Sequence, residues 1–221
     1  MVGGGDEREE SASEKMDFLT HSLMGAGAAR LVAPRRDWRP QLALAAVLGS
    51  TLMDGDSWVA LLGANHYGFY HRTVTHSIVG LIVLAGVAAV VAKWVSLSAW
   101  GRRFGWFIAP NRMLEEAPTT SAPWGWFLLV AATAAALHWC GDVITGFGNM
   151  CPFWPWDTRD VSLRAVFSFD WFIFSATLGW HIAIRRLDWP RRREWALTAV
   201  YVVCVAGYVW ARLRWGAPTF C

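Results

Sequence analysis

Four stretches of the chain are long and apolar enough to cross a lipid bilayer, and this feature limits the possible folds most strongly. A membrane-spanning helix needs about 20 predominantly apolar residues. The expected spans cover residues 74–95, 124–145, 166–187 and 195–212. Only 17% of the 221 residues are charged, against about 25% in an average soluble domain. We therefore expect an all-α, polytopic membrane helical bundle, and not a soluble domain or a nucleic-acid-binding protein.

Two shorter apolar segments, residues 17–33 and 41–62, precede these spans and are interrupted by ionisable side chains. We expect them to form two shorter N-terminal membrane helices that pack against the four spans. Residues 1–15 are acidic and rich in Gly and Ser, which is typical of a disordered tail. Residues 16–221 are then expected to form a single membrane-embedded domain.

The basic residues alternate between the two sides of the predicted membrane domain. Thirteen of the 20 Lys and Arg residues lie in segments 30–39, 93–123 and 185–194. Positively charged loops stay in the cytoplasm, so we interpret these arginines mainly as topology signals. The Trp-rich segment 151–156 would then lie at the non-cytoplasmic interface, as an aromatic belt does.

Ionisable residues inside apolar segments are costly to insert and are therefore functional candidates. Seven of the eight in this chain fall at the predicted non-cytoplasmic ends of their helices; the eighth, His181, lies towards the basic end. The seven are His21, Asp54, Asp56, His76, His138, Asp142 and Asp170. We expect them, with His71 just outside a span, to form one site facing the non-cytoplasmic side.

Two pairs of these residues have spacings that suit a metal ion. His138 and Asp142 are four residues apart and share one helix face. They can bind one ion, or Asp142 can orient His138, or the two can form a buried polar pair that joins helices. Asp54 and Asp56 flank Gly55, so they can face one or two cations, or one of them can cap a helix.

A short motif occurs twice, as T-H-S-L-M-G at residues 20–25 and as T-H-S-I-V-G at residues 75–80. The hydroxyls can cap helices and the Gly permits close helix packing. We expect the two copies to deliver His21 and His76 to the same centre. A serine nucleophile beside one of these histidines is an alternative, but no G-x-S-x-G elbow supports it.

The number of candidate ligands is larger than the four that one zinc ion takes. Some of these residues would therefore lie outside the first coordination shell, or a second ion would be bound. They are His21, Asp54, Asp56, His71, His76, His138, Asp142 and Asp170. Imidazole and carboxylate without thiolate favour zinc, with manganese or iron as alternatives. Arg72 carries a planar charged fork suited to an anionic group, although it can also anchor the chain at the membrane interface.

The chain resembles the YdjM-like, LexA-regulated inner-membrane metal-dependent hydrolases. The resemblance rests on M-D-x-x-T-H-S (16–22), D-x-D (54–56), H-R-x-x-T-H-S (71–77), H-x-x-x-D-x-x-T (138–145), G-x-x-x-P-F (148–153) and the later Asp170. Met53 stands where the family usually has Pro, and Thr73 where it usually has Gly, but both departures leave the candidate ligands intact. The resemblance implies an inner-membrane location, one or two divalent ions and hydrolase activity.

These observations predict a membrane-embedded metal-dependent hydrolase that acts on a phosphoester or a lipid-like amphiphile, with membrane lipid as a partner and no nucleic acid. The preferred direct ligands are His21, His76, His138 and Asp142; the second group, which completes another ion or supplies a general base, is Asp54, Asp56, His71 and Asp170. Of these, Asp56 and His71 are the expected catalytic residues, and Arg72 would hold an anionic group of the substrate. Two alternatives stay open: a metal-binding transporter or channel, and a structural or regulatory membrane protein with a non-catalytic metal site.

Overall fold

The computed structural model describes seven segments of the chain. They are residues 6–56, 71–98, 121–145, 150–163, 165–166, 170–186 and 190–215. The α-helices are α1 (Asp6–Val32), α2 (Arg39–Thr51), α5 (Ile78–Leu97), α7 (Trp124–Thr145), α8 (Trp171–Arg186) and α9 (Arg191–Trp215). Two 3-10 helices, η1 (Arg36–Trp38) and η2 (Leu52–Asp56), and a π-helix, η3 (His71–Thr75), complete the regular structure of these segments. The expectation of an all-α fold is confirmed.

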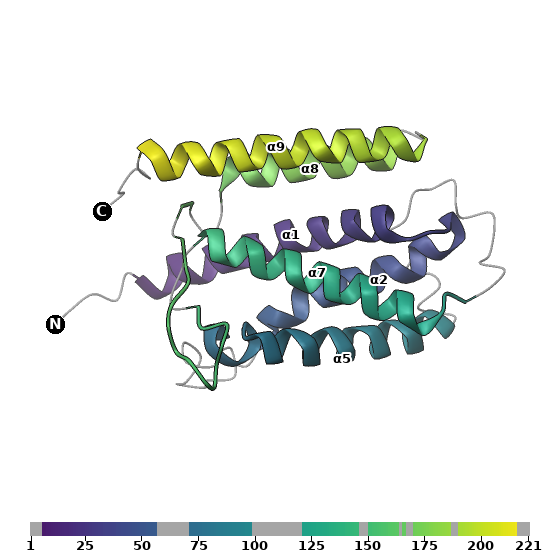
Figure 1. The fold of residues 1–221 in the computed structure, drawn as a ribbon, viewed down its shortest axis with the longest axis horizontal. Coiled ribbons are helices and arrows are strands. Elements are labelled where there is room, and N and C mark those ends of the chain that lie inside the picture. The colour runs from purple at the N-terminus through teal and green to yellow at the C-terminus, as the bar shows by residue number, and fades with distance from the viewer. Residues whose placement is uncertain are drawn as a thin grey trace.

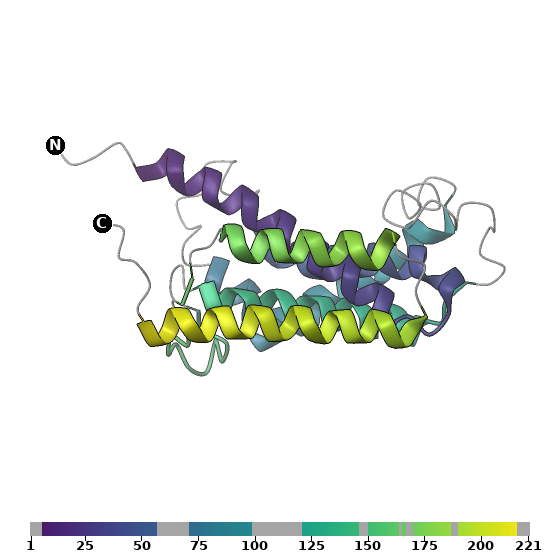
Figure 2. The ribbon, with the colours of Figure 1, turned by 90° about the horizontal axis from the view of Figure 1, so that it is seen from above.

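Helix α2 lies at the centre of a bundle in which it packs against α1, α5 and α7 (Figure 1). Helix α8 packs against α1, and α9 packs against α8. Seen from above, α8 and α9 run side by side across one face of the bundle (Figure 2). The metal-ligand candidates at the end of α2, before the start of α5 and in α7 therefore lie on or next to helices that contact one another directly.

Within the described segments, three helices have the length and apolarity needed to cross a membrane: α5, α7 and α9. The fourth expected span, residues 166–187, is corrected by the structure, because α8 begins at Trp171 and has 16 residues. Asp170 stops the helix from starting earlier, since its Oδ1 accepts hydrogen bonds from the backbone N–H groups of Phe172 and Ile173. The preceding Ala165 instead donates its backbone N–H to the carbonyl of Ile144, at the end of α7.

The two N-terminal helices differ in length from the expected segments. Helix α1 begins at Asp6, inside the segment expected to be disordered, and ends at Val32; the side chains of residues 6–17 lie outside the description. Helix α2 ends at Thr51, and the 3-10 helix that follows carries the chain to Asp56. The remainder of the expected helix 41–62 lies outside the described residues.

Small residues bring the helices of the bundle close together. Ala residues dominate the main core, which α2, α5 and α7 share with the end of α1. At Gly49 of α2, an added Cβ would clash with the backbone carbonyl of Ala131 in α7, so only Gly permits this approach. At Gly25 of α1, an added Cβ would lie 2.6 Å from Oγ of Ser50 in α2. Packing through small residues is typical of membrane helices, where apolar side chains gain nothing by leaving the lipid.

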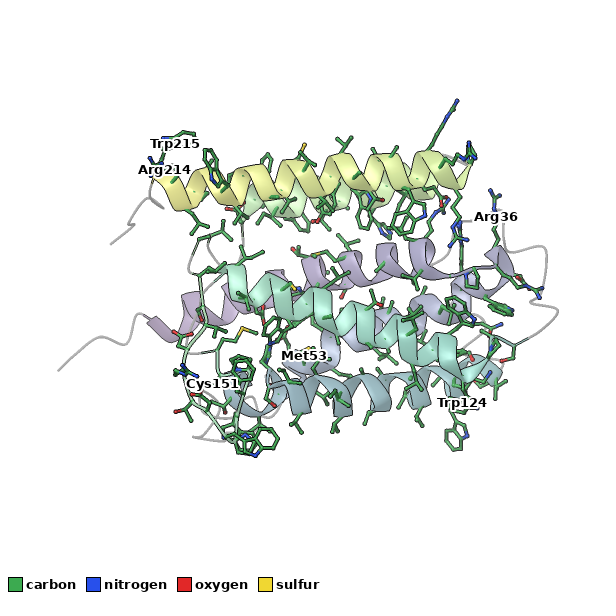
Figure 3. The ribbon with its side chains drawn as sticks, viewed as in Figure 1. Arg36, Met53, Trp124, Cys151, Arg214 and Trp215 are labelled. Carbon is green, nitrogen blue, oxygen red and sulfur yellow. The ribbon has the colours of Figure 1, made fainter. Side chains whose placement is uncertain are left out.

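The helix directions place the predicted site and the basic segments at opposite ends. Figure 3 labels Arg36 and Trp124 towards one end of the molecule and Cys151 towards the other. Helices α2 and α7 begin at the first end, whereas α5 begins at the second. The end of α2, the start of α5 and the end of α7 therefore meet at the end opposite to the basic segments.

Candidate metal centre

Four ionisable side chains converge where α2 ends, α5 begins and α7 ends. They are Asp54 from η2, His76 from the residues just before α5, and His138 and Asp142 from α7. One ligand atom from each lies within 4.8 Å of the ligand atoms of all the others. Among the residues that the structure describes, these four form the group that can hold a metal ion.

The distances between the ligand atoms are those of a small coordination site. Oδ2 of Asp142 lies 2.7 Å from Nε2 of His76 and 3.2 Å from Nε2 of His138. The two Nε2 atoms are 3.2 Å apart, and each lies 3.4 Å from Oδ1 of Asp54. Tetrahedral ligands about 2.0–2.2 Å from a zinc ion are about 3.3–3.6 Å from one another. Most of the observed separations are therefore close to what one divalent ion requires.

The centre is buried, with one more open side. His76, His138 and Asp142 expose 0%, 1% and 2% of their surface, whereas the side chain of Asp54 remains 19% exposed. Buried charged groups are stable only when they are paired or when they coordinate metals. Two imidazoles and two carboxylates suit a divalent ion such as zinc, manganese or iron, so the buried cluster can hold one. Asp54 lies on the more exposed side of the centre.

Local structure orients His76 towards the centre. Oγ1 of Thr75 lies 2.9 Å from Nδ1 of His76. With Nδ1 held on this side, Nε2 on the other side of the ring faces the carboxylates. Ser77 is the N-cap of α5 and its Oγ accepts a hydrogen bond from the backbone N–H of Gly80. The indole Nε1 of Trp139 in α7 donates to the backbone carbonyl of His76. These contacts hold the histidine between α5 and α7.

His21 approaches the centre from α1. Its Nε2 lies 3.3 Å from Oδ1 of Asp142, and its ring centroid lies 3.9 Å from that of His138. A Cβ at Gly141 would come within 2.8 Å of Cε1 of His21, so the glycine makes room for this ring. Asp142 thus presents Oδ1 to His21 and Oδ2 to His76 and His138.

The two copies of the repeated motif act differently in the structure. Both histidines, His21 and His76, contact Asp142. Ser77 caps a helix, but Ser22 lies inside the continuous helix α1 and donates to the carbonyl of Phe18. The capping role open to the hydroxyls of the motif is therefore found at Ser77 and not at Ser22.

The structure does not bring Asp170 into this group. Both oxygens of Asp170 are engaged elsewhere: Oδ1 caps α8, and Oδ2 accepts a hydrogen bond of 2.6 Å from the hydroxyl of Tyr208 in α9. Asp170 was a ligand candidate because it opens an apolar helix, and that position also explains its capping role. The side chains of Asp56, His71 and Arg72 lie outside the described residues, although their backbones belong to η2 and η3.

Three residues that shape the centre were not among the predicted site residues: Thr75, Trp139 and Gly141. Thr75 stood in the repeated motif, but only a capping role was expected of its hydroxyl. Gly141 directly precedes Asp142, and a glycine beside a buried ligand could have signalled the close approach of another ring. No comparable signal marked the indole of Trp139.

The segment after α7 covers this end of the bundle. The backbone N–H of Ile78, at the start of α5, donates to the carbonyl of Pro152. Phe153 and Trp156 of the same segment are exposed, as expected for an aromatic belt. Cys151 is buried, and its Sγ donates to the carbonyl of Thr158. Burial, together with two carboxylates nearby, raises the pKa of its thiol.

A known protein family matches most of the chain. The family model described as YdjM inner membrane protein matches residues 16–216. The chain belongs to the YdjM inner membrane protein family. The resemblance stated from the sequence motifs is thus confirmed, and the match extends past Asp170 to include α8 and α9. Comparisons with curated proteins and with solved structures each gave no match. The YdjM description and the apolar helices both indicate an inner-membrane protein.

Proposed function

We propose that this protein is a membrane-embedded, metal-dependent hydrolase. The observation that carries the proposal is the convergence of two imidazole nitrogens and two carboxylate oxygens in a buried group of Asp54, His76, His138 and Asp142. These residues would hold a divalent ion, with zinc preferred and manganese or iron as alternatives. When bound there, such an ion supplies Lewis acidity, which polarises a scissile group and makes water more acidic.

The protein residues around the centre have distinct roles in this proposal. Asp142 ties the site together, because its two oxygens face histidines from three different segments. Asp54 lies on the more exposed side, where a substrate group and water can approach. Asp56 and His71 are proposed as general bases or as ligands of a second ion, and Arg72 as a group that binds a substrate anion. Their backbone positions in η2 and η3, which hold Asp54 and lead to His76, support this.

The proposed substrate is a phosphoester or a lipid-like amphiphile at the membrane interface. The cluster lies at the ends of the apolar helices α5 and α7, beside a segment with exposed aromatic side chains. Interfaces of this kind attract molecules that are apolar at one end and polar at the other. Since the basic segments lie at the opposite end, the proposed site faces the non-cytoplasmic side.

A structural metal site is the second candidate, and the extreme burial of three of the four ligands favours it. Closed metal sites with no open position tie helices together and stabilise the fold without catalysis. In that case the ion would join η2, the start of α5 and α7, and no substrate would reach it. Asp54 is the residue whose exposure argues for access.

The two candidates are separated by measuring metal content and hydrolysis on the same purified samples. The molar ratio of bound metal to protein is measured by elemental mass spectrometry. Turnover is measured with phosphomonoesters, phosphodiesters and phospholipids as substrates. We expect Asp54→Asn to reduce both bound metal and turnover. Asp157→Asn is the matched control, because Asp157 pairs with Arg159 on the surface. Metal-loaded wild-type protein that hydrolyses none of these substrates would favour the structural site.

A further inference from the structure

A second group of buried charged residues lies at the end of the bundle opposite to the metal centre. Arg30, in the last turn of α1, donates from Nε and Nη2 to Oε1 of Glu194 at 2.9 and 2.6 Å. Arg39, the first residue of α2, donates from Nη2 to Oε2 of the same carboxylate at 3.2 Å. Glu194 lies in the first turn of α9 and is 1% exposed. Two guanidinium groups therefore share one carboxylate where three helices meet.

Several N–H donors of these two guanidinium groups are not used by Glu194. Arg30 and Arg39 are 8% and 6% exposed, so both are more than nine-tenths buried. Nη1 of Arg30, and both Nε and Nη1 of Arg39, have no hydrogen-bond partner in the part of the chain that the structure describes. Both side chains converge on Glu194, so these donors belong to two guanidinium groups that lie side by side. An incompletely paired charge in such a position is costly unless an anion completes it.

The surroundings increase the positive potential at this place. Helices α2 and α9 both begin here, and the N-terminus of a helix carries a partial positive charge. Arg191 adds a third guanidinium, which donates to the carbonyl of Leu31 at 2.9 Å. Asp37, an acidic residue nearby in the sequence, is already paired with Arg35 at 2.8 Å. Among the residues that the structure describes at this junction, the single carboxylate of Glu194 faces two guanidinium groups.

We propose that Arg30 and Arg39 bind a phosphate group at the junction of α1, α2 and α9. A phosphate offers several strongly accepting oxygens, and the planar fork of arginine matches their spacing. Glu194 holds the two forks in place and leaves their remaining donors for the ligand. The phosphate is that of an anionic phospholipid headgroup or a free phosphate ion, and this site is independent of the metal centre and of the proposed hydrolase activity.

The first experiment measures thermal unfolding of the intact protein in a neutral detergent. The probes are inorganic phosphate, with chloride at matched ionic strength as its control, and micelles doped with phosphatidylglycerol, with phosphatidylcholine as their control. We expect a concentration-dependent rise in melting temperature from at least one of the two phosphate probes. A rise with phosphatidylglycerol alone identifies the headgroup as the source, and a rise with both shows that free phosphate also binds. A response to neither probe beyond its control overturns the proposal.

Variants then test whether the named arginines carry the effect. Arg39→Gln should weaken binding of the active probe by about tenfold or more, since it removes charge-assisted hydrogen bonds. Arg192→Gln is the matched control, because Arg192 is an exposed arginine in the first turn of α9, and it should change binding by less than about twofold. Equal losses in both variants would show general surface attraction and overturn the proposal.

Glu194→Gln keeps the proposal testable if Arg39→Gln does not fold. This change removes the competing charge while keeping a hydrogen-bonding side chain between the two arginines. We expect it to lower the stability of the ligand-free protein and to tighten binding of the active probe by several-fold. A purely structural charge cluster would show the lost stability without tighter binding, and that outcome contradicts the proposal.

Discussion

His21 and His76, which occupy equivalent positions in a repeated motif, contact opposite oxygens of a single carboxylate. Nε2 of His21 lies 3.3 Å from Oδ1 of Asp142, and Nε2 of His76 lies 2.7 Å from Oδ2. The carboxylate therefore connects α1 to the start of α5 through α7. This arrangement makes Asp142 the residue on which the proposed metal centre depends most.

Replacing Asp142 with Asn should reduce metal affinity by about 10–100-fold or more. The amide keeps the shape of the side chain but lacks the negative charge that attracts a divalent ion. Metal per protein and melting temperature are measured on the same preparation, with Asp157→Asn as the control. Unchanged metal content together with a lower melting temperature would instead make Asp142 a residue that only joins helices.

The variants His21→Ala and His76→Ala should both lose bound metal, with the larger loss for His76→Ala. Nε2 of His76 lies close to three ligand atoms of the cluster, whereas His21 contacts the far oxygen of Asp142. Because both act on one carboxylate, the double variant should lose less binding free energy than the sum of the single losses. Titration with zinc measures all three. Full metal content in His21→Ala would exclude His21 from the centre.

Gly141→Ala should disturb the centre without replacing any candidate ligand. The added methyl would lie 2.8 Å from Cε1 of His21 and push the ring away from Asp142. We expect metal affinity close to that of His21→Ala. Gly125→Ala is the matched control in the same helix, since nothing lies within 4 Å of the added Cβ there. Equal metal binding by the two alanine variants would show that His21 does not need this space.

Asp170→Ala should lower stability by about 1 kcal/mol, as the loss of an N-cap does, while metal content stays at the wild-type level. The reason is that both oxygens of Asp170 are used by α8 and by Tyr208. Tyr208→Phe, which removes only the second contact, should have a smaller effect on the melting temperature. Loss of metal in Asp170→Ala would return this residue to the list of ligands.

Labelling with impermeant thiol reagents tests the proposed sidedness. In a variant without native cysteines, Trp156→Cys should react from outside intact cells and Arg192→Cys should be protected. The reverse pattern would invert the topology.

Cys151, restored to the variant without other cysteines, should react slowly with the same reagents at neutral pH, because the residue is buried and the pKa of its thiol is raised. Since the thiolate is the reactive form, its rate should rise with pH up to that raised pKa. Fast labelling at neutral pH would contradict its buried position.

Local patterns in the sequence were sufficient to predict much of the fold and part of the centre. Hydropathy predicted the apolar helices α5, α7 and α9, because about 20 apolar residues in a row have few other stable environments. The spacing of His138 and Asp142 predicted that they share a face, because helical geometry is set within one turn. The repeat indicated that His21 and His76 reach one place, although it did not indicate that they meet through Asp142.

Tertiary structure decided which candidates meet and which do not. Asp54 and Asp170 are both carboxylates beside apolar helices, yet one faces two imidazoles and the other caps α8 and binds Tyr208. A carboxylate satisfies either environment equally well, so its residue type cannot distinguish them. The distinction depends on which helices approach closely, and that is set by small residues such as Gly49 and Gly141 across pairs of helices. The sequence by itself determined the helices and the available ligands, and only their packing decided the centre, because contacts between distant segments depend on how whole surfaces fit together.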